Sequence, residues 1–140
     1  PLANFIIENC DWLTQEQKER LHDNSGFEFS DHEAVTIADT LQKKVDDGTA
    51  RKQEEVNKQE RKGAEDWNAG LQKQQDALGE EAKKETGNDK LVPYDYPEPF
   101  KKKWDDLQKQ HDWNASYPFA EANIKEFICF LRECGGFKVC

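Results

Sequence analysis

The C-terminal stretch 119–140, FAEANIKEFICFLRECGGFKVC, decides how this chain must be organised. It contains Cys129, Cys134 and Cys140, whereas the fourth cysteine, Cys10, lies near the N-terminus. If all four cysteines are oxidised, three of them cannot pair among themselves, so Cys10 must bond to one of this trio. The arithmetic therefore predicts two disulfides that tie the two ends of the chain together.

Helical phase ranks the possible pairings. Apolar residues at helical spacing in this stretch predict a final helix, with Cys134 at the edge of its apolar face and Cys129 away from it. Cys10 also lies on an apolar face, so the preferred connectivity is Cys10–Cys134 with Cys129–Cys140. The alternative is Cys10–Cys129 with Cys134–Cys140. A bridge from Cys10 to the last helix closes a loop of roughly 100 residues, which contributes up to about 4–5 kcal/mol in the chain-entropy model.

Composition limits the fold and the class of partner. The chain has 140 residues, of which 35% are apolar and 35% are charged, so we expect a single domain, 1–140, with one modest core. The net charge of -9 disfavours binding to nucleic acid and to anionic membranes. No apolar run approaches the ~20 residues of a membrane span. We therefore expect neither a nucleic-acid partner nor membrane insertion.

Several features favour a secreted, extracellular protein. An even number of cysteines at the two termini suits an oxidising compartment. The sequence begins with Pro1 and contains no Met, which is typical of a chain trimmed after translation, such as one that has lost a secretory signal. Asn114-Ala115-Ser116 is an N-glycosylation sequon, and it makes Asn114 a possible glycosylation site.

The N-terminal third predicts short helices. Residues 4–13 have the spacing of an amphipathic helix. Thr14–Gln17 and Ser30–Glu33 each have the form of a capping box, in which the first and last side chains bond to each other's backbone N–H groups. The second box precedes apolar residues at helical spacing, and Gly48 ends that helix.

The middle of the chain, 49–90, is highly polar. Strong helix formers predominate there, and Trp67, Leu71 and Leu78 keep a narrow helical stripe. This pattern predicts a polar extended helix or one arm of a helical hairpin, able to seat against a single neighbour. The alternative is a disordered polar linker.

The last third returns to shorter elements. Prolines make 87–99 a loop, to which Tyr94 and Tyr96 give an aromatic surface. A helix face follows from Phe100, then a turn over 113–118, then the final helix. No stretch shows strand-like alternation of useful length. The predicted fold is therefore all-α: a small, disulfide-stapled helical protein with a compact N/C-terminal end and a longer, highly polar middle helix.

No arrangement of residues indicates catalysis. His22, His32 and His111 form no zinc-binding pair, and the cysteine spacings do not match the CxxC of zinc or thioredoxin-like sites. The sequence contains neither a glycine-rich phosphate loop nor a nucleophile elbow. We therefore expect no catalytic residue, no metal and no cofactor, and we expect that the protein is not an enzyme.

Binding is the remaining class of function. Aromatic residues are enriched at protein interfaces. The possible partner-binding residues are Tyr94, Tyr96, Trp113 and Tyr117, although each of these rings can equally cover the small core.

Two resemblances suggest what is bound. Residues 12–21, WLTQEQKERL, are similar to the start of a nematode polyprotein allergen unit, a family of helical fatty-acid and retinol carriers. This resemblance implies an alternative function, the carriage of fatty acids or other small hydrophobic ligands. It covers about ten residues, and the rest of the chain departs from that pattern.

The second resemblance is one of design. A small acidic chain with polar helices, four cysteines and the end FICFLREC (127–134) resembles the anopheline (mosquito) salivary inhibitors of the alternative complement pathway. That family is helical and acts by binding the C3 convertase. The resemblance implies a host extracellular protein as partner, first a component of the complement convertase and next a component of haemostasis.

Overall fold

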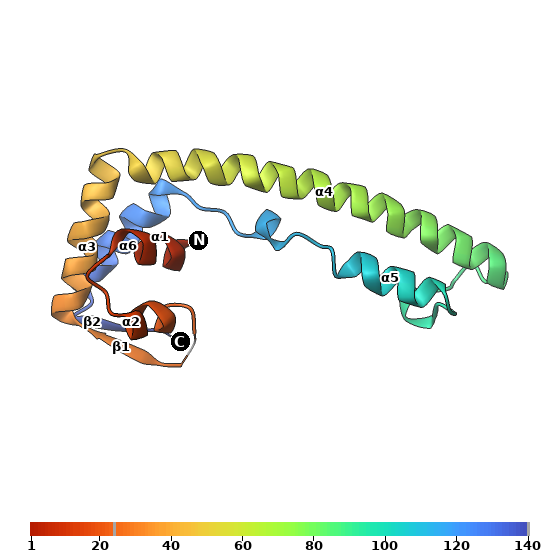
Figure 1. Ribbon diagram of the computed structural model, residues 1–140, viewed down its shortest axis with the longest axis horizontal. Helices are drawn as coiled ribbons and strands as arrows, with labels where there is room; N and C mark the ends of the chain where they lie inside the picture. Colours follow the sequence, from red (N-terminus) through yellow and green to blue (C-terminus); the bar gives the residue numbers. More distant parts are fainter. Residues whose placement is uncertain (24, 140) are drawn as a thin grey trace. The chain divides into compact units, whose positions relative to one another are not determined.

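The computed structural model describes residues 1–23 and 25–139, which form two compact units. Unit 1 consists of Pro1–Lys58 with Pro118–Cys140, and unit 2 of Gln59–Tyr117. The described residues are mostly helical, which confirms the helical class predicted from the sequence. The long helix α4 (Thr49–Thr86) contributes residues to both units (Figure 1).

Unit 1 brings the two ends of the chain into one core. Helix α3 packs along α6, and α1 packs against α3 (Figure 1). Phe5 of α1 and Phe119, just before α6, lie with their ring centroids 5.0 Å apart in this core. The helices of this unit, besides the start of α4, are α1 (Leu2–Asn9), α2 (Gln15–Arg20), α3 (Asp31–Asp46) and α6 (Glu121–Glu133).

Both predicted capping boxes are confirmed. Thr14 Oγ1 accepts a hydrogen bond from the Gln17 N–H at the start of α2, and Ser30 Oγ accepts one from the Glu33 N–H at the start of α3. In return, Gln17 Oε1 accepts from the Thr14 N–H at 2.9 Å, and Glu33 Oε2 accepts from the Ser30 N–H at 2.8 Å. Gln17 Nε2 also donates to Glu33 Oε1 at 2.6 Å, so the two boxes are linked. The bonds from Ser30 lower the pKa of the Glu33 carboxyl.

Helix α6 receives its N-terminal cap from α4. Its own N-cap residue, Ala120, has no side chain that can accept a hydrogen bond. Glu54 Oε2 accepts from the Glu121 N–H at 2.9 Å instead, and this bond lowers the pKa of Glu54. Asn57 Oδ1 accepts from the Phe119 N–H at 2.7 Å. Two α4 side chains thus fix the start of the final helix.

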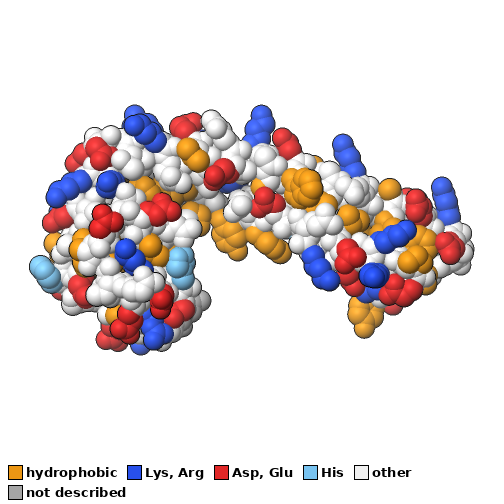
Figure 2. Space-filling model, viewed as in Figure 1, with side chains coloured by type: hydrophobic (Ala, Val, Ile, Leu, Met, Phe, Trp, Pro, Cys, Tyr) orange, Lys and Arg blue, Asp and Glu red, His pale blue; other side chains and the backbone are white. Residues whose placement is uncertain are grey.

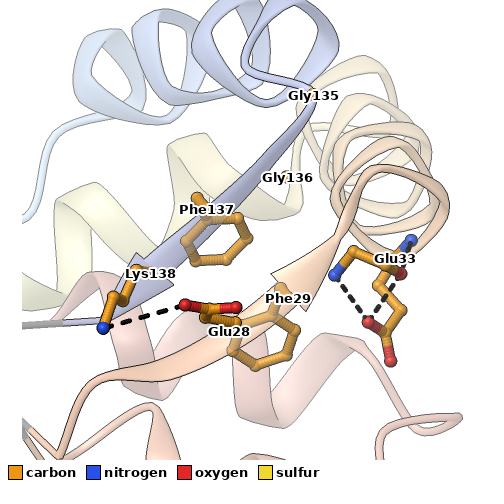
Figure 3. A pocket seen from close by; sticks show the side chains of 8 residues that line it. Glu28, Phe29, Glu33, Gly135, Gly136, Phe137 and Lys138 are labelled. Atoms are coloured by element: carbon orange, nitrogen blue, oxygen red, sulfur yellow. Dashed lines mark hydrogen bonds and ion pairs between the residues drawn. The ribbon is translucent and has the colours of Figure 1, made fainter.

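A small sheet, which the sequence did not predict, joins the two ends of the chain in unit 1. Strand β1 (Phe27–Ser30) pairs antiparallel with β2 (Gly136–Val139), and Phe29 lies opposite Phe137 with ring centroids 4.8 Å apart (Figure 3). Gly136 has φ +107°, and a Cβ there would lie 2.8 Å from Phe29 O. Glycine at position 136 therefore lets β2 begin in close contact with the end of β1. Both strands do alternate apolar and polar residues, as FEFS (27–30) and FKV (137–139), but runs of four and three residues are at or below the shortest length from which a strand can be predicted.

The cysteines are unpaired in the part of the chain that the structure describes. Cys10 is fully buried beside Thr40 of α3, and burial raises the pKa of its thiol to about 11. Cys134 is half-buried and donates to Leu131 O at 3.6 Å, while Cys129 is exposed on α6. The structure therefore contains neither the preferred Cys10–Cys134 bridge nor the alternative Cys10–Cys129 bridge: the Cys10 thiol lies beside Thr40, and the Cys134 thiol donates to Leu131 O. Pairings with Cys140 lie outside the described residues.

Unit 2 is built on the polar helix. The structure confirms that the stretch after Gly48 is helical and not a disordered linker, since α4 runs unbroken to Thr86. The loop after α4 contains the short 3-10 helix η1 (Pro93–Asp95), and helix α5 (Phe100–Gln108) follows it. A second 3-10 helix, η2 (Trp113–Ser116), ends the unit. The small core of unit 2 consists of Leu78, Ala82, Tyr96 and Phe100, with Leu91, Trp104 and Leu107 packed against it.

Candidate protein-binding surface

Side chains of α4 hold the segment 110–117, which includes η2, beside the helix. Asn68 Nδ2 donates to Asp112 O, and the Asp112 N–H donates to Asn68 Oδ1, both at 2.9 Å. Trp67 Nε1 donates to Gln110 O at 2.9 Å, and Arg61 Nε donates to Ala115 O at 3.3 Å. The Asn68 amide satisfies both backbone groups of Asp112, as a neighbouring strand would. The segment is therefore fixed by hydrogen bonds although little apolar surface covers it.

This arrangement leaves large aromatic faces in contact with solvent. Trp67 is 53% exposed, Trp113 64% and Tyr117 55%. The only hydrogen-bonding group of the Trp67 indole is used by the backbone, so the exposed part of that ring is apolar. The His111 ring packs edge-on against Trp113 with centroids 4.6 Å apart. Figure 2 shows hydrophobic side chains at the surface of the molecule, interspersed with charges of both signs.

Two of these rings surround a surface hollow of about 580 Å³, which we call the aromatic pocket. Its lining comes from one α4 side chain and from the segment that α4 holds. The lining residues are Trp67, Gln110, His111, Asp112, Trp113 and Asn114.

The structure separates the four aromatic residues predicted as contacts. Trp113 and Tyr117 lie on the 110–117 segment, whereas Tyr94 lies on η1, is 86% exposed and does not line the aromatic pocket. The expectation of an exposed Tyr96 is wrong, because its ring is buried in the unit 2 core and packs edge-on against Trp104. Tyr96 fits there because the facing residue on α4 is Gly79.

Sequence reasoning missed four residues of the aromatic pocket, which are Trp67, Gln110, His111 and Asp112. Trp67 belongs to the predicted apolar stripe of α4, in which Leu71 and Leu78 are indeed buried, but Trp67 itself is exposed. The other three residues follow the end of α5 at Gln108. No local pattern could reveal that these residues line one pocket, because this depends on where the 110–117 segment lies.

The glycosylation candidate Asn114 lies on η2 and is exposed. Its backbone N–H donates to Asp112 Oδ1 at 2.9 Å. Since Asn114 also lines the aromatic pocket, a glycan on this residue would stand directly over the exposed rings.

Unit 1 carries a second hollow, the apolar groove, of about 710 Å³. Residues of α1, α6 and β2 line it, and Cys134 lies among them. The ring of Phe130 contributes to this lining and is 49% exposed. The large apolar side chains of the groove are Leu2, Ile6, Leu21, Phe127, Phe130 and Phe137.

A third hollow, of about 590 Å³, lies beside the small sheet (Figure 3). Its acidic groups already have partners, because Glu33 accepts from Ser30 and Glu28 pairs with Lys138 at 3.7 Å. This hollow therefore offers no unpaired carboxylate to a ligand.

Neither a metal centre nor a membrane-spanning helix occurs in residues 1–23 and 25–139. Their His, Cys, Asp and Glu side chains form no group of three or more that could hold a metal ion. None of their helices is both long enough and apolar enough to cross a bilayer. His22 and His32 are exposed.

Comparison with known proteins does not extend this description. No family model matches the chain, and no match is found among curated proteins or among solved structures.

Proposed function

We propose that this chain is a non-enzymatic binding protein whose partner-binding surface is formed by Trp67 and Trp113 at the aromatic pocket and by Tyr117 at the end of the same segment as Trp113. One observation carries the proposal: three large rings are more than half exposed on a backbone that hydrogen bonds hold in place. The Trp67 indole is held by its bond to Gln110 O, and the Trp113 ring packs against His111. These two rings lose little conformational entropy on binding, so more of their burial energy contributes to affinity.

The energy available at these rings is sufficient for a specific contact. Covering the exposed half of a large aromatic side chain removes on the order of 100 Å² from water, which is worth about 2.5 kcal/mol. Interfaces typically obtain most of their affinity from a few such residues near their centre. Single exposed apolar residues are ordinary on protein surfaces, but three on and beside one short segment form a cluster.

The class of partner follows from charge and from the resemblance to salivary inhibitors. A net charge of -9 favours association with a basic surface. We place the protein in the extracellular space, where it would inhibit a host protein cascade at a blood-feeding interface. Components of the alternative-pathway convertase are the first partners to test, and haemostatic proteins are the next.

The test combines function with matched variants. Purified protein would be added to an alternative-pathway haemolysis assay and to clotting-time assays. We expect inhibition that Trp113→Ala weakens at least about tenfold, since truncation of a central aromatic costs about 2 kcal/mol or more. Trp12→Ala is the control, because Trp12 is also an exposed tryptophan, at 41%, but belongs to unit 1. Inhibition that both variants retain would reject this surface, and no effect in either assay would reject the blood-feeding target.

The apolar groove favours a second candidate function, the carriage of a small hydrophobic ligand such as a fatty acid. Its volume and its lining of leucine, isoleucine and phenylalanine side chains are typical of apolar ligand sites. Titration with a fluorescent fatty acid tests this candidate. Stoichiometric uptake that Phe130→Ser reduces and Trp113→Ala does not would establish it, whereas absence of uptake would reject it.

A further inference from the structure

We propose that the aromatic pocket receives an arginine side chain of the partner protein. This inference rests on the proposed function, because it concerns the same surface, and it adds the chemistry that the surface recognises.

The walls of the pocket attract cations. The indoles of Trp67 and Trp113 both line it and are both more than half exposed. The faces of aromatic rings carry partial negative charge, and tryptophan binds cations most strongly of the aromatic residues. Because Trp67 Nε1 already donates to Gln110 O, this indole presents its ring and not its N–H donor to a ligand.

Acceptors complete the pocket. One carboxylate oxygen of Asp112 accepts from the Asn114 N–H, and the other has no hydrogen-bond partner in the part of the chain that the structure describes. Gln110 uses its amide nitrogen on Asp106 O at 3.1 Å, which leaves its amide oxygen available. An incoming donor would thus meet a charged and a neutral acceptor.

No described residue supplies a competing cation to the lining. Neither lysine nor arginine lines the pocket within the described ranges. The nearest described group to His111 Nε2 is the Asn68 amide nitrogen, at 3.5 Å, and that amide also donates to Asp112 O. No lysine or arginine of the lining therefore pairs with the Asp112 carboxylate.

Arginine fits this combination better than other side chains do. Its guanidinium is planar, stacks on aromatic rings and donates in parallel to a carboxylate. A purely apolar ligand would bury the Asp112 carboxylate without a partner, which is costly. A lysine would satisfy the charge but would stack less well. The acidic character of the whole chain would also steer a basic segment toward this surface.

The probe for this inference is a short synthetic peptide, acetyl-Gly-Ser-Arg-Ser-Gly-amide, compared with the same peptide carrying citrulline. Citrulline keeps the shape of arginine but has no charge. Binding would be followed by NMR through the indole N–H resonances, assigned by Trp→Phe variants of the full chain. We expect the arginine peptide to shift the Trp67 and Trp113 resonances saturably and to leave Trp12 unchanged. We expect the citrulline peptide to bind about six- to fifteenfold more weakly, because it loses a cation–π contact worth about two- to fivefold at a partly exposed site and a charge interaction with Asp112 worth about threefold.

Asp112→Asn provides the second test, because asparagine retains the oxygen that accepts from the Asn114 N–H. This variant should reduce the affinity for the arginine peptide about threefold and leave the citrulline peptide unaffected. Equal affinity for the two peptides, or no shift at Trp67 and Trp113, would overturn the inference. If Trp113→Ala still abolished inhibition in the haemolysis or clotting assay, the proposed surface would stand. Arginine-peptide binding combined with unchanged inhibition by Trp113→Ala would instead reject the proposed function and retain this pocket chemistry.

Discussion

Gly79 provides the sharpest test of how unit 2 is packed. A Cβ at this position of α4 would lie 2.7 Å from Tyr96 Oη, and Tyr96 is buried against Trp104 at a centroid distance of 5.6 Å. At Gly63 and Gly70, also within α4, a Cβ would meet no atom within 4 Å. The three glycines thus share a helix and differ in what an alanine would contact.

The expected free energies of unfolding follow from that difference. Replacing an exposed helical glycine by alanine stabilises by about 0.5–1 kcal/mol, so Gly63→Ala and Gly70→Ala should each gain that amount. Gly79→Ala has the same favourable effect on the backbone, but its new methyl group must displace a buried ring, and overpacking of this kind costs about 1–3 kcal/mol. The free energy of unfolding of Gly79→Ala should therefore be unchanged or lower by up to about 2.5 kcal/mol.

Tyr96→Phe isolates the contact. Without the hydroxyl, the nearest ring atom would lie 3.8 Å from the new Cβ, an ordinary van der Waals distance. The double variant Gly79→Ala/Tyr96→Phe should therefore recover the gain seen at Gly63. Urea unfolding followed by tryptophan fluorescence and near-UV circular dichroism measures each change. If Gly79→Ala stabilises as much as Gly63→Ala does, the packing of Tyr96 against α4 is wrong.

Three further predictions concern the cap of α3, the thiols and the sequon. Ser30→Ala should lower the free energy of unfolding by about 0.5–2 kcal/mol. The pKa of the Glu33 carboxyl is lowered in the folded protein, so this group stabilises the fold at pH values above its ordinary pKa of 4.5. That stabilisation is lost as the pH falls through the folded-state pKa. Glu33→Gln should therefore reduce the decrease in the free energy of unfolding that urea titrations show at acid pH. Iodoacetamide should label Cys129 in the native protein and Cys10 only after unfolding, since Cys10 is buried and its pKa is raised to about 11. If no cysteine is labelled in a native, unreduced sample, the thiols are not free. Glycosylated protein should bind the arginine peptide more weakly than its Ser116→Ala counterpart, and equal affinity would show that a glycan on Asn114 does not cover the aromatic pocket.

Features encoded within a few residues could be predicted from the sequence. The capping boxes at Thr14 and Ser30 need only a side chain and the backbone three positions away, and both were confirmed. The polar helix from Thr49 was predictable because strong helix formers accumulate over many turns. The β1–β2 pairing was not, since each strand is defined by a partner at the other end of the chain.

The cysteines and the aromatic residues show the same limit. Helical phase correctly predicted that Cys10 is buried, although α1 ends at Asn9 and not at residue 13, but it could not tell a core thiol from half of a disulfide. In the same way, composition indicated that some aromatic rings would be exposed without indicating which. Tyr96 is buried because Gly79 leaves room for it, and Trp67 is exposed because its indole N–H bonds to the backbone of a distant segment.

The contrast between buried leucines and an exposed tryptophan on α4 supports a binding role for that tryptophan. Leu71 and Leu78 are buried, whereas Trp67, the largest side chain of the stripe, is 53% exposed. The indole N–H of Trp67 helps to hold the 110–117 segment, but this hydrogen bond does not require the exposed part of the ring. Stability alone therefore does not account for the exposed apolar surface of Trp67, or for that of Trp113 and Tyr117 on the segment that α4 holds. A partner that covers these rings gives all three a common physical reason.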